Sequence, residues 1–277
     1  MKYSEQNAYK HKEALNISQK IYSDFLVLRS NEKDFLLRHH PSYIDSHKFS
    51  AQLLTQDLDA LHQLMQDSLN LTQEINSIKT ELELYLNTFQ DIVALQSTLG
   101  TTPEQGLYGQ LRLSAHKLEH LFSENQQQHT MNLLLHIRKS EKDFILHPSK
   151  NHLETFNTQL KQLSQEVATN GYSQSLQAEL KLYIKNYEKT FTRYANNALK
   201  KGESEHDGLQ GTLRKQARNL EMLITAIKKD ILHDSLLSEI NTHSHARILS
   251  ATFPLLVLLL ALMPFILNMT RKEEKKY

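Results

Sequence analysis

Cysteine and tryptophan are absent from this chain of 277 residues, and glycine and proline are scarce, at 7 and 5 residues. The absence of cysteine excludes a disulfide framework, although it is compatible with either side of a membrane. A β architecture is disfavoured because it needs many turn residues. Leucine, glutamine, glutamate and lysine are abundant, and all four are good helix formers. The composition therefore predicts an all-α protein.

The chain also lacks a large net charge, and it lacks the common catalytic motifs. The formal net charge is +1, and no basic run occurs outside the C-terminal tail, so nothing indicates nucleic-acid binding. We find no glycine-rich phosphate loop, no Gly-x-Ser-x-Gly motif and no histidine-kinase catalytic region. We therefore expect no enzymatic activity and no cofactor.

The 15 histidines raise the question of a metal site. His116 and His120 are four residues apart, which puts two imidazoles on one helix face. The sequence offers no cysteine, no His-Glu-x-x-His motif and no evident third ligand. We therefore expect no metal.

Three motifs occur twice, in the same order, about a hundred residues apart. This predicts duplication of one helical unit, because the period is longer than the roughly 20 to 50 residues of a solenoid repeat. The pairs are RSNEKDFLLR at 29–38 with RKSEKDFILH at 138–147, LELYLNTF at 82–89 with LKLYIKNY at 180–187, and GLYGQLR at 106–112 with GLQGTLR at 208–214.

The three motifs repeat at offsets of 109, 98 and 102 residues, respectively. The differences of eleven and seven residues correspond to about three helical turns and one heptad, so length changes of this size keep the same face toward the core. On this alignment Tyr85 and Tyr183 are equivalent.

Turn-forming residues such as His40-Pro41 and Asn170-Gly171 divide the chain into about six helices. Two of them running through both halves would produce two stacked four-helix bundles. The expected helices cover 4–40, 45–99, 104–147, 150–169, 172–201 and 205–270.

Apolar stripes with alternating spacings of four and three residues mark two helices. No glycine or proline occurs within 110–147 or 212–253, so we expect each stretch to be one continuous helix. The stripes are Leu111, Ala115, Leu118 and Phe122 in the first helix, and Leu213, Ala217, Leu220, Ile224, Ile227 and Ile231 in the second.

Residues 248–270 contain no charged side chain, and this length is sufficient for the roughly 30 Å hydrocarbon core of a bilayer. We predict a transmembrane helix, followed by the basic segment RKEEKK at 271–276, which places the C-terminus in the cytoplasm. The predicted organisation is an extracytoplasmic helical domain at 1–247, a transmembrane helix at 248–270 and a cytoplasmic stub at 271–277.

The N-terminal residues MKYSEQN resemble neither a signal peptide nor a membrane anchor. An extracytoplasmic domain needs such a segment, so we expect an upstream span to be missing and the chain to be a fragment of a longer receptor. The alternative is a tail-anchored protein with its helices in the cytoplasm.

The doubled motifs Arg-x-x-Glu-Lys-Asp-Phe and Gly-Leu-x-Gly-x-Leu-Arg resemble those of the helical bimodular (HBM) sensor domain, over nearly all of residues 1–247. That family supplies the extracytoplasmic, periplasmic part of methyl-accepting chemotaxis receptors and some sensor histidine kinases in the inner membrane. The resemblance implies two stacked four-helix bundles, a homodimer, and binding of a small organic acid, with acetate in the second module.

Candidate ligand-binding residues are basic or carry a phenol. Arg29 and Lys33, like Arg138 and Lys142, are four residues apart, so each pair presents two cations on one helix face, which suits a carboxylate. Tyr85 and Tyr183 offer hydroxyl groups, and Arg218 is a candidate for a contact specific to the second module.

A structural interpretation of the same motifs competes with the ligand interpretation. Charged residues repeated in both modules suit a polar network that sets helix register, since two modules rarely need the same ligand. The candidates for this network are Glu32, Asp34, Arg38 and Arg112, with Glu141, Asp143 and Arg214.

Two other functions remain open. The chain could be a membrane-anchored structural tether, which would lack polar groups converging inside the bundle. It could instead be a sensor that docks a periplasmic binding protein, for which we expect an exposed apolar patch at the end of the bundle farthest from the membrane.

Overall fold

The computed structural model describes residues 2–125, 127–204 and 206–273, with side chains described for 6–7, 9–125, 127–204, 206–240 and 252. These residues form eight helices and no strand, which confirms the predicted all-α class. The helices are α1 (Lys2–Arg38), α2 (Ser42–Leu64), α3 (Leu69–Leu99), α4 (Gly106–Glu124), α5 (Gln128–Leu146), α6 (Lys150–Thr169), α7 (Gln174–Lys201) and α8 (Gly208–Glu273).

The prediction of six helices was wrong at two places, because the chain turns without glycine or proline. The expected helix 45–99 is interrupted between α2 and α3, where the Ser68 amide donates to the Met65 carbonyl (2.9 Å). The expected helix 104–147 is interrupted between α4 and α5, where Asn125 Nδ2 donates to the Leu121 carbonyl (2.7 Å). A backbone turn at the first break and a side chain bonded to the backbone at the second therefore accompany helix ends that have no glycine or proline.

The prediction of a continuous last helix is confirmed. Helix α8 runs without a break through the stretch 212–253. All ten residues of the two predicted apolar stripes are buried, six on α8 and four on α4. The spacing of four and three residues therefore identified the faces that pack in the core.

Contacts divide the chain into two compact units. The first consists of Met1–Ser23, Thr55–Asn76 and Leu223–Tyr277, which are parts of α1, α2, α3 and α8. Within it Lys20 of α1 pairs with Asp57 of α2 (2.8 Å), and the Lys228 ammonium of α8 lies 4.8 Å from the centre of the Tyr22 ring.

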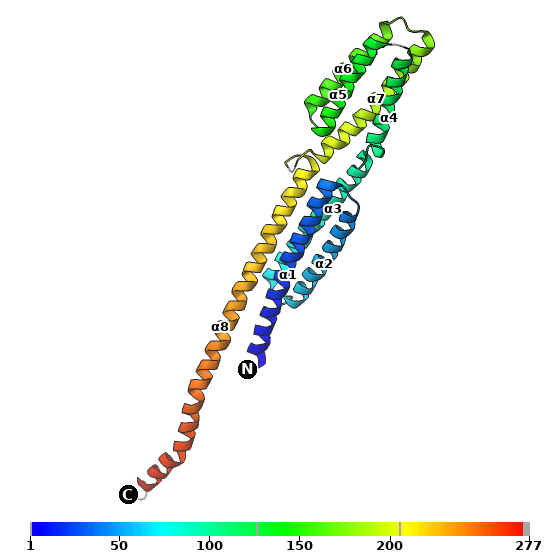
Figure 1. Cartoon of the computed structure of the whole chain (residues 1–277). Helices are drawn as coiled ribbons and strands as arrows, with labels where there is room; N and C mark the ends of the chain where they lie inside the picture. The colour runs from blue at the N-terminus through cyan, green and yellow to red at the C-terminus, as the bar shows by residue number, and fades with distance from the viewer. Residues whose placement is uncertain (1, 126, 205, 274–277) are drawn as a thin grey trace. The chain divides into compact units, whose positions relative to one another are not determined.

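The second unit consists of Asp24–Leu54 and Ser77–Met222. In it α4, α5, α6 and α7 lie side by side, with α5 packed on α6 and α4 packed on α7 (Figure 1). Their core contains aromatic side chains at its centre, among them Phe144, Phe156 and Phe191. This arrangement is a four-helix bundle with short connections.

Two connections with the same conformation explain the repeated Gly-Leu motif. Gly106 and Gly208 begin α4 and α8 with φ of +59° and +57°, a region that disfavours side chains. A Cβ atom at Gly106 would lie 2.5 Å from the backbone nitrogen of Gly100, and one at Gly208 would lie 2.6 Å from that of Gly202. The motif is therefore required by the turn.

Among the residues that the structure describes, no helix combines the length and the apolar character needed to cross a bilayer. The predicted span at 248–270 falls in a segment whose side chains, Thr252 excepted, lie outside the described residues.

Candidate functional site

A buried polar cluster joins α1, α2 and α3, and we name it the first cluster: Arg29, Glu32, His47 and Tyr85. Arg29 Nη1 donates to the Glu32 carboxylate, and the Tyr85 hydroxyl donates to Glu32 Oε2 (2.5 Å). Glu32 and His47 are each 3 % exposed, and Tyr85 is fully buried. A carboxylate in this position is therefore held by donors from two helices.

His47 completes the first cluster from α2. Its Nε2 atom lies 3.4 Å from the Tyr85 hydroxyl, and its ring stacks on Phe89 with centroids 3.8 Å apart. Since the single hydroxyl proton of Tyr85 goes to Glu32, the hydrogen bond with His47 requires the Nε2-protonated tautomer as donor.

The second cluster consists of Arg138, Glu141, Phe156 and Tyr187 and joins α5, α6 and α7. Arg138 Nη1 donates to both oxygens of Glu141 (2.5 and 2.7 Å), and the Tyr187 hydroxyl donates to the same carboxylate. Phe156 stands where the first cluster has His47, with its ring stacked on Phe191 at a centroid distance of 3.6 Å. The motif is therefore duplicated in three dimensions.

The equivalence of the tyrosines differs from the prediction. Tyr187, 102 residues after Tyr85, makes the bond to the buried carboxylate. Tyr183, expected to match Tyr85, is partly exposed and lies under the Lys117 ammonium, 5.5 Å from it. The offset of 98 was therefore wrong by four residues, about one helical turn, which keeps the side chain on nearly the same face. The offset of 102 from the glycine motif would have identified Tyr187.

Burial controls the electrostatics of the first cluster. Burial raises the pKa of the Glu32 carboxyl, although Arg29 and the Tyr85 hydroxyl favour its ionised form. Burial and the Glu32 charge raise the pKa of Tyr85 well above its ordinary value. Burial and the charge of Arg29 lower the pKa of His47 to about 3. At neutral pH the cluster therefore contains a neutral imidazole and a neutral phenol beside the Arg29–Glu32 pair.

The other predicted ligand residues do not converge on the clusters. Lys33, Lys142 and Arg218 are exposed. The guanidinium groups of Arg29 and Arg138 are each paired with a carboxylate of their own helix. A free cationic pocket inside the bundle is therefore not formed by these residues.

The predicted network residues divide into two groups. Glu32 and Glu141 lie at the centres of the clusters. The others lie near helix ends. Arg38 contacts Asp34 (3.6 Å) and the Tyr43 hydroxyl (2.5 Å), and Arg112 contacts Glu104 (2.9 Å). Arg214 lies 3.4 Å from the His206 ring, and the backbone carbonyl of Asp143 accepts from the His147 amide (2.9 Å).

His47 is the site residue that the sequence reasoning missed. It follows the apolar spacing of α2, in line with Ala51, Leu54 and Leu58, all of which are buried. A histidine on an apolar stripe was the available signal.

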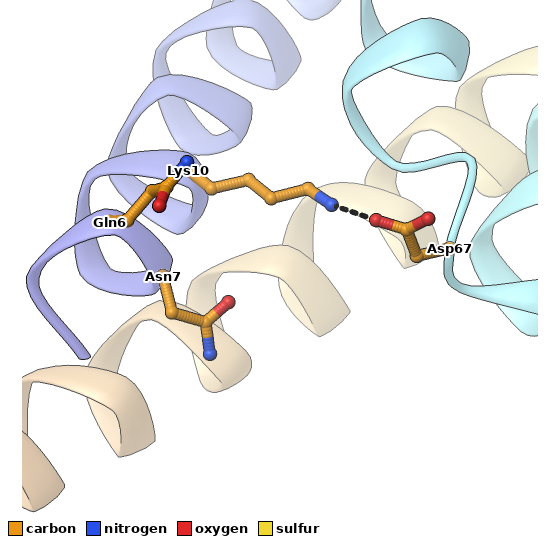
Figure 2. Close-up of a pocket in the computed structure, with 4 residues that line it drawn as sticks. All are labelled: Gln6, Asn7, Lys10 and Asp67. Atoms are coloured by element: carbon orange, nitrogen blue, oxygen red, sulfur yellow. Dashed lines mark hydrogen bonds and ion pairs between the residues drawn. The ribbon is translucent and has the colours of Figure 1, made fainter. Parts of the chain in front are cut away.

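A polar depression of about 200 Å³ lies in the first unit. Figure 2 shows its described lining, Gln6, Asn7 and Lys10 of α1 with Asp67, which follows α2. Lys10 Nζ contacts Asp67 Oδ2 at 2.8 Å. None of the predicted ligand residues is among these four.

The histidines considered for a metal pair with carboxylates of their own helix. His116 lies 2.8 Å from Glu119, and His120 lies 3.1 Å from Glu124. Within the described part of the chain, no three His, Cys, Asp or Glu residues are grouped so as to hold a metal ion.

Comparison with models of known protein families finds no match, and comparison with curated proteins finds none either.

Proposed function

We propose that this chain is the ligand-sensing region of a transmembrane chemoreceptor or sensor kinase, with the HBM organisation of two stacked four-helix bundles over residues 1–247. The duplicated clusters support the proposal, because each ties two helices together through one buried carboxylate, α1 to α3 in the first cluster and α5 to α7 in the second. Such a connection makes the helices of a bundle respond as a unit when one of them shifts.

The observation that carries the proposal is the continuity of α8. Its buried stripe lies in the core, and the same helix continues into the charge-free segment 248–270. A rigid helix can transmit a displacement of about 1 to 2 Å between its ends. In this proposal 248–270 spans the inner membrane, and the bundles are periplasmic and act as a homodimer.

The proposed ligand is a small organic acid that binds on the outer side of Arg29 and Lys33. The Arg29 side chain keeps 19 % exposure beside its pair with Glu32, and Lys33 is exposed one turn further on. In the second cluster, Arg138 Nε also contacts Glu119 Oε1 (3.4 Å), so a second carboxylate already pairs with that guanidinium. This difference favours the first cluster as the working site.

The test is thermal unfolding of the full chain in a neutral detergent, screened against organic acids, amino acids, polyamines and purines. A compound that binds the folded state raises the midpoint. We expect a rise of several degrees with an organic acid, lost in Lys33→Gln and kept in the matched control Lys142→Gln. Neither Lys33 nor Lys142 is itself a member of the buried ion pairs.

Loss of the rise in both variants, or in neither, would contradict the proposed site. No rise with any compound would contradict direct sensing, and would favour a tether or a sensor that docks a periplasmic binding protein.

A further inference from the structure

Helix α7 carries four cations at intervals of four residues: Lys181, Lys185, Lys189 and Arg193. All four are exposed. At 1.5 Å per residue they extend over about 18 Å of the helix surface. We call this surface the cationic stripe.

The stripe is unfavourable for the helix that bears it. Like charges four residues apart repel each other and destabilise a helix. Lys181 Nζ contacts Gln177 Oε1 (3.2 Å), and within the described part of the chain Lys185, Lys189 and Arg193 form no ion pair. Helix α7 has six basic and two acidic residues, so its own carboxylates do not balance the stripe.

The first repeat shows that the bundle does not require this charge. With the offset of 102 residues, Lys185 corresponds to Glu83 of α3, and Arg193 corresponds to Asp91. Both α3 residues are also exposed, and α3 as a whole has four acidic residues and one lysine. Lys181 corresponds to Lys79 and Lys189 to the neutral Asn87, so two of the four positions carry the opposite charge in the first repeat and the continuous stripe occurs on α7 alone of the two helices.

We propose that the cationic stripe is a docking surface for a partner protein that presents an acidic face. Charge complementarity is the argument, since carboxylates on the partner would remove the repulsion within α7 and steer the encounter. A second copy of this chain, placed by a two-fold axis on the stripe, would bring the same cations against it. The two copies would repel each other there, so a second copy does not fit as the partner.

Two other anionic partners fit the stripe less well. Single-stranded nucleic acid is bound with aromatic side chains available for stacking, whereas Tyr187 and Tyr194 of α7 are buried and Tyr183 lies under Lys117. A lipid surface is bound by helices with a broad apolar face, whereas Leu182 is the one large hydrophobic residue of α7 described as exposed.

The test uses the full chain in a neutral detergent and poly-L-glutamate of about 20 residues as the probe of an acidic face. The variant Lys185→Glu/Arg193→Asp installs the side chains of the first repeat. The control Lys48→Glu/Lys161→Glu changes the net charge equally, at exposed positions of α2 and α6. We expect the first variant to weaken binding about tenfold at low salt, and the control to weaken it less than twofold.

Equal weakening by both variants, or no binding of the probe, would overturn the proposal. Oligothymidine or phosphatidylglycerol vesicles that bind more tightly than poly-L-glutamate, with the same loss in the first variant, would also overturn it, because the partner would then be of another class. The thermal response to organic acids is measured on the same variants. It reports on Arg29 and Lys33 independently, so failure of one proposal is distinguishable from failure of the other.

Discussion

The two polar clusters differ at one core position, where His47 in the first cluster is replaced by Phe156 in the second. Each ring stacks on an equivalent phenylalanine, with centroids 3.8 and 3.6 Å apart, so the packing geometry is nearly unchanged. The first cluster gains a polar neighbour for its tyrosine, and the second gains Glu119 as a second partner for its arginine. The duplicated fold therefore keeps the carboxylate and varies its surroundings.

Removal of the central carboxylate should have the largest effect. Glu32→Gln leaves Arg29 half-buried without its partner, and we expect a loss of about 3 kcal/mol in the free energy of unfolding. Glu141→Gln should lose less, about 2 kcal/mol, because Arg138 keeps Glu119. Urea unfolding of the full chain at pH 7, followed by circular dichroism, measures both. The exposed control Glu83→Gln should change stability by less than about 0.5 kcal/mol. An equal loss in the two clusters would contradict the role of Glu119.

The second largest difference between the clusters should be in the stability lost when the pH is lowered. The pKa of His47 is lowered from 6.5 to about 3 in the folded protein, so between these values the unfolded state binds more protons. The stabilisation due to neutral His47 is present above pH 6.5 and is lost progressively as the pH falls toward 3. At pH 4.5, two units below 6.5, this loss is about 2.5 kcal/mol.

Replacement of the histidine checks this acid sensitivity. His47→Phe, which copies the second cluster, should remove that part of the pH dependence of urea unfolding between pH 7 and 4.5. Phe156→His should introduce a similar dependence in the second cluster. Parallel pH profiles for wild type and His47→Phe would show that His47 does not control the acid response.

Loss of a tyrosine hydroxyl should have a smaller effect and tests the register of the repeat. Tyr85→Phe and Tyr187→Phe each remove a donor to a buried carboxylate, and we expect each to lose about 1.5 kcal/mol of unfolding free energy. Tyr183→Phe should change stability by less than about 0.5 kcal/mol, because that ring is partly exposed. A larger loss for Tyr183→Phe than for Tyr187→Phe would restore the offset of 98 residues.

Exchange of an exposed charge between the equivalent helices α3 and α7 should have the smallest effect on stability. Lys185→Glu replaces two repulsive contacts, with Lys181 and Lys189, by attractive ones and one attractive contact, with Glu188, by a repulsive one, so we expect a net gain of about 0.5 kcal/mol in the free energy of unfolding at low salt. The gain should disappear at high salt because exposed charges are screened. A loss of stability would show that Lys185 has a structural partner.

Much of the fold could be predicted because local patterns report it directly. The spacing of Leu213 to Ile231 identified the buried face of α8, and the repeated glycines marked turns that only glycine adopts. The breaks after Leu64 and Glu124 were missed because neither contains glycine or proline: a backbone bond from Ser68 to Met65 closes the first, and the Asn125 side chain bonds to the backbone at the second.

Less of the candidate site could be predicted. Arg29, Glu32, Tyr85, Arg138 and Glu141 were all singled out, but their pairing was not. Arg29 and Glu32 are three residues apart on one helix, as are Arg138 and Glu141. This spacing allows an ion pair but does not require one, so the sequence could not show whether each arginine is free to bind a ligand.

The sequence by itself determined that the protein is helical, that one unit is duplicated, and that the last helix is continuous, since each follows from composition, repetition or periodicity. The tertiary structure alone decided that Tyr187 matches Tyr85, that Glu32 and Glu141 hold the arginines, and that His47 is buried and neutral. The physical reason is the helical period: a slip of four residues leaves a side chain on nearly the same face, and only a contact with another helix selects one register.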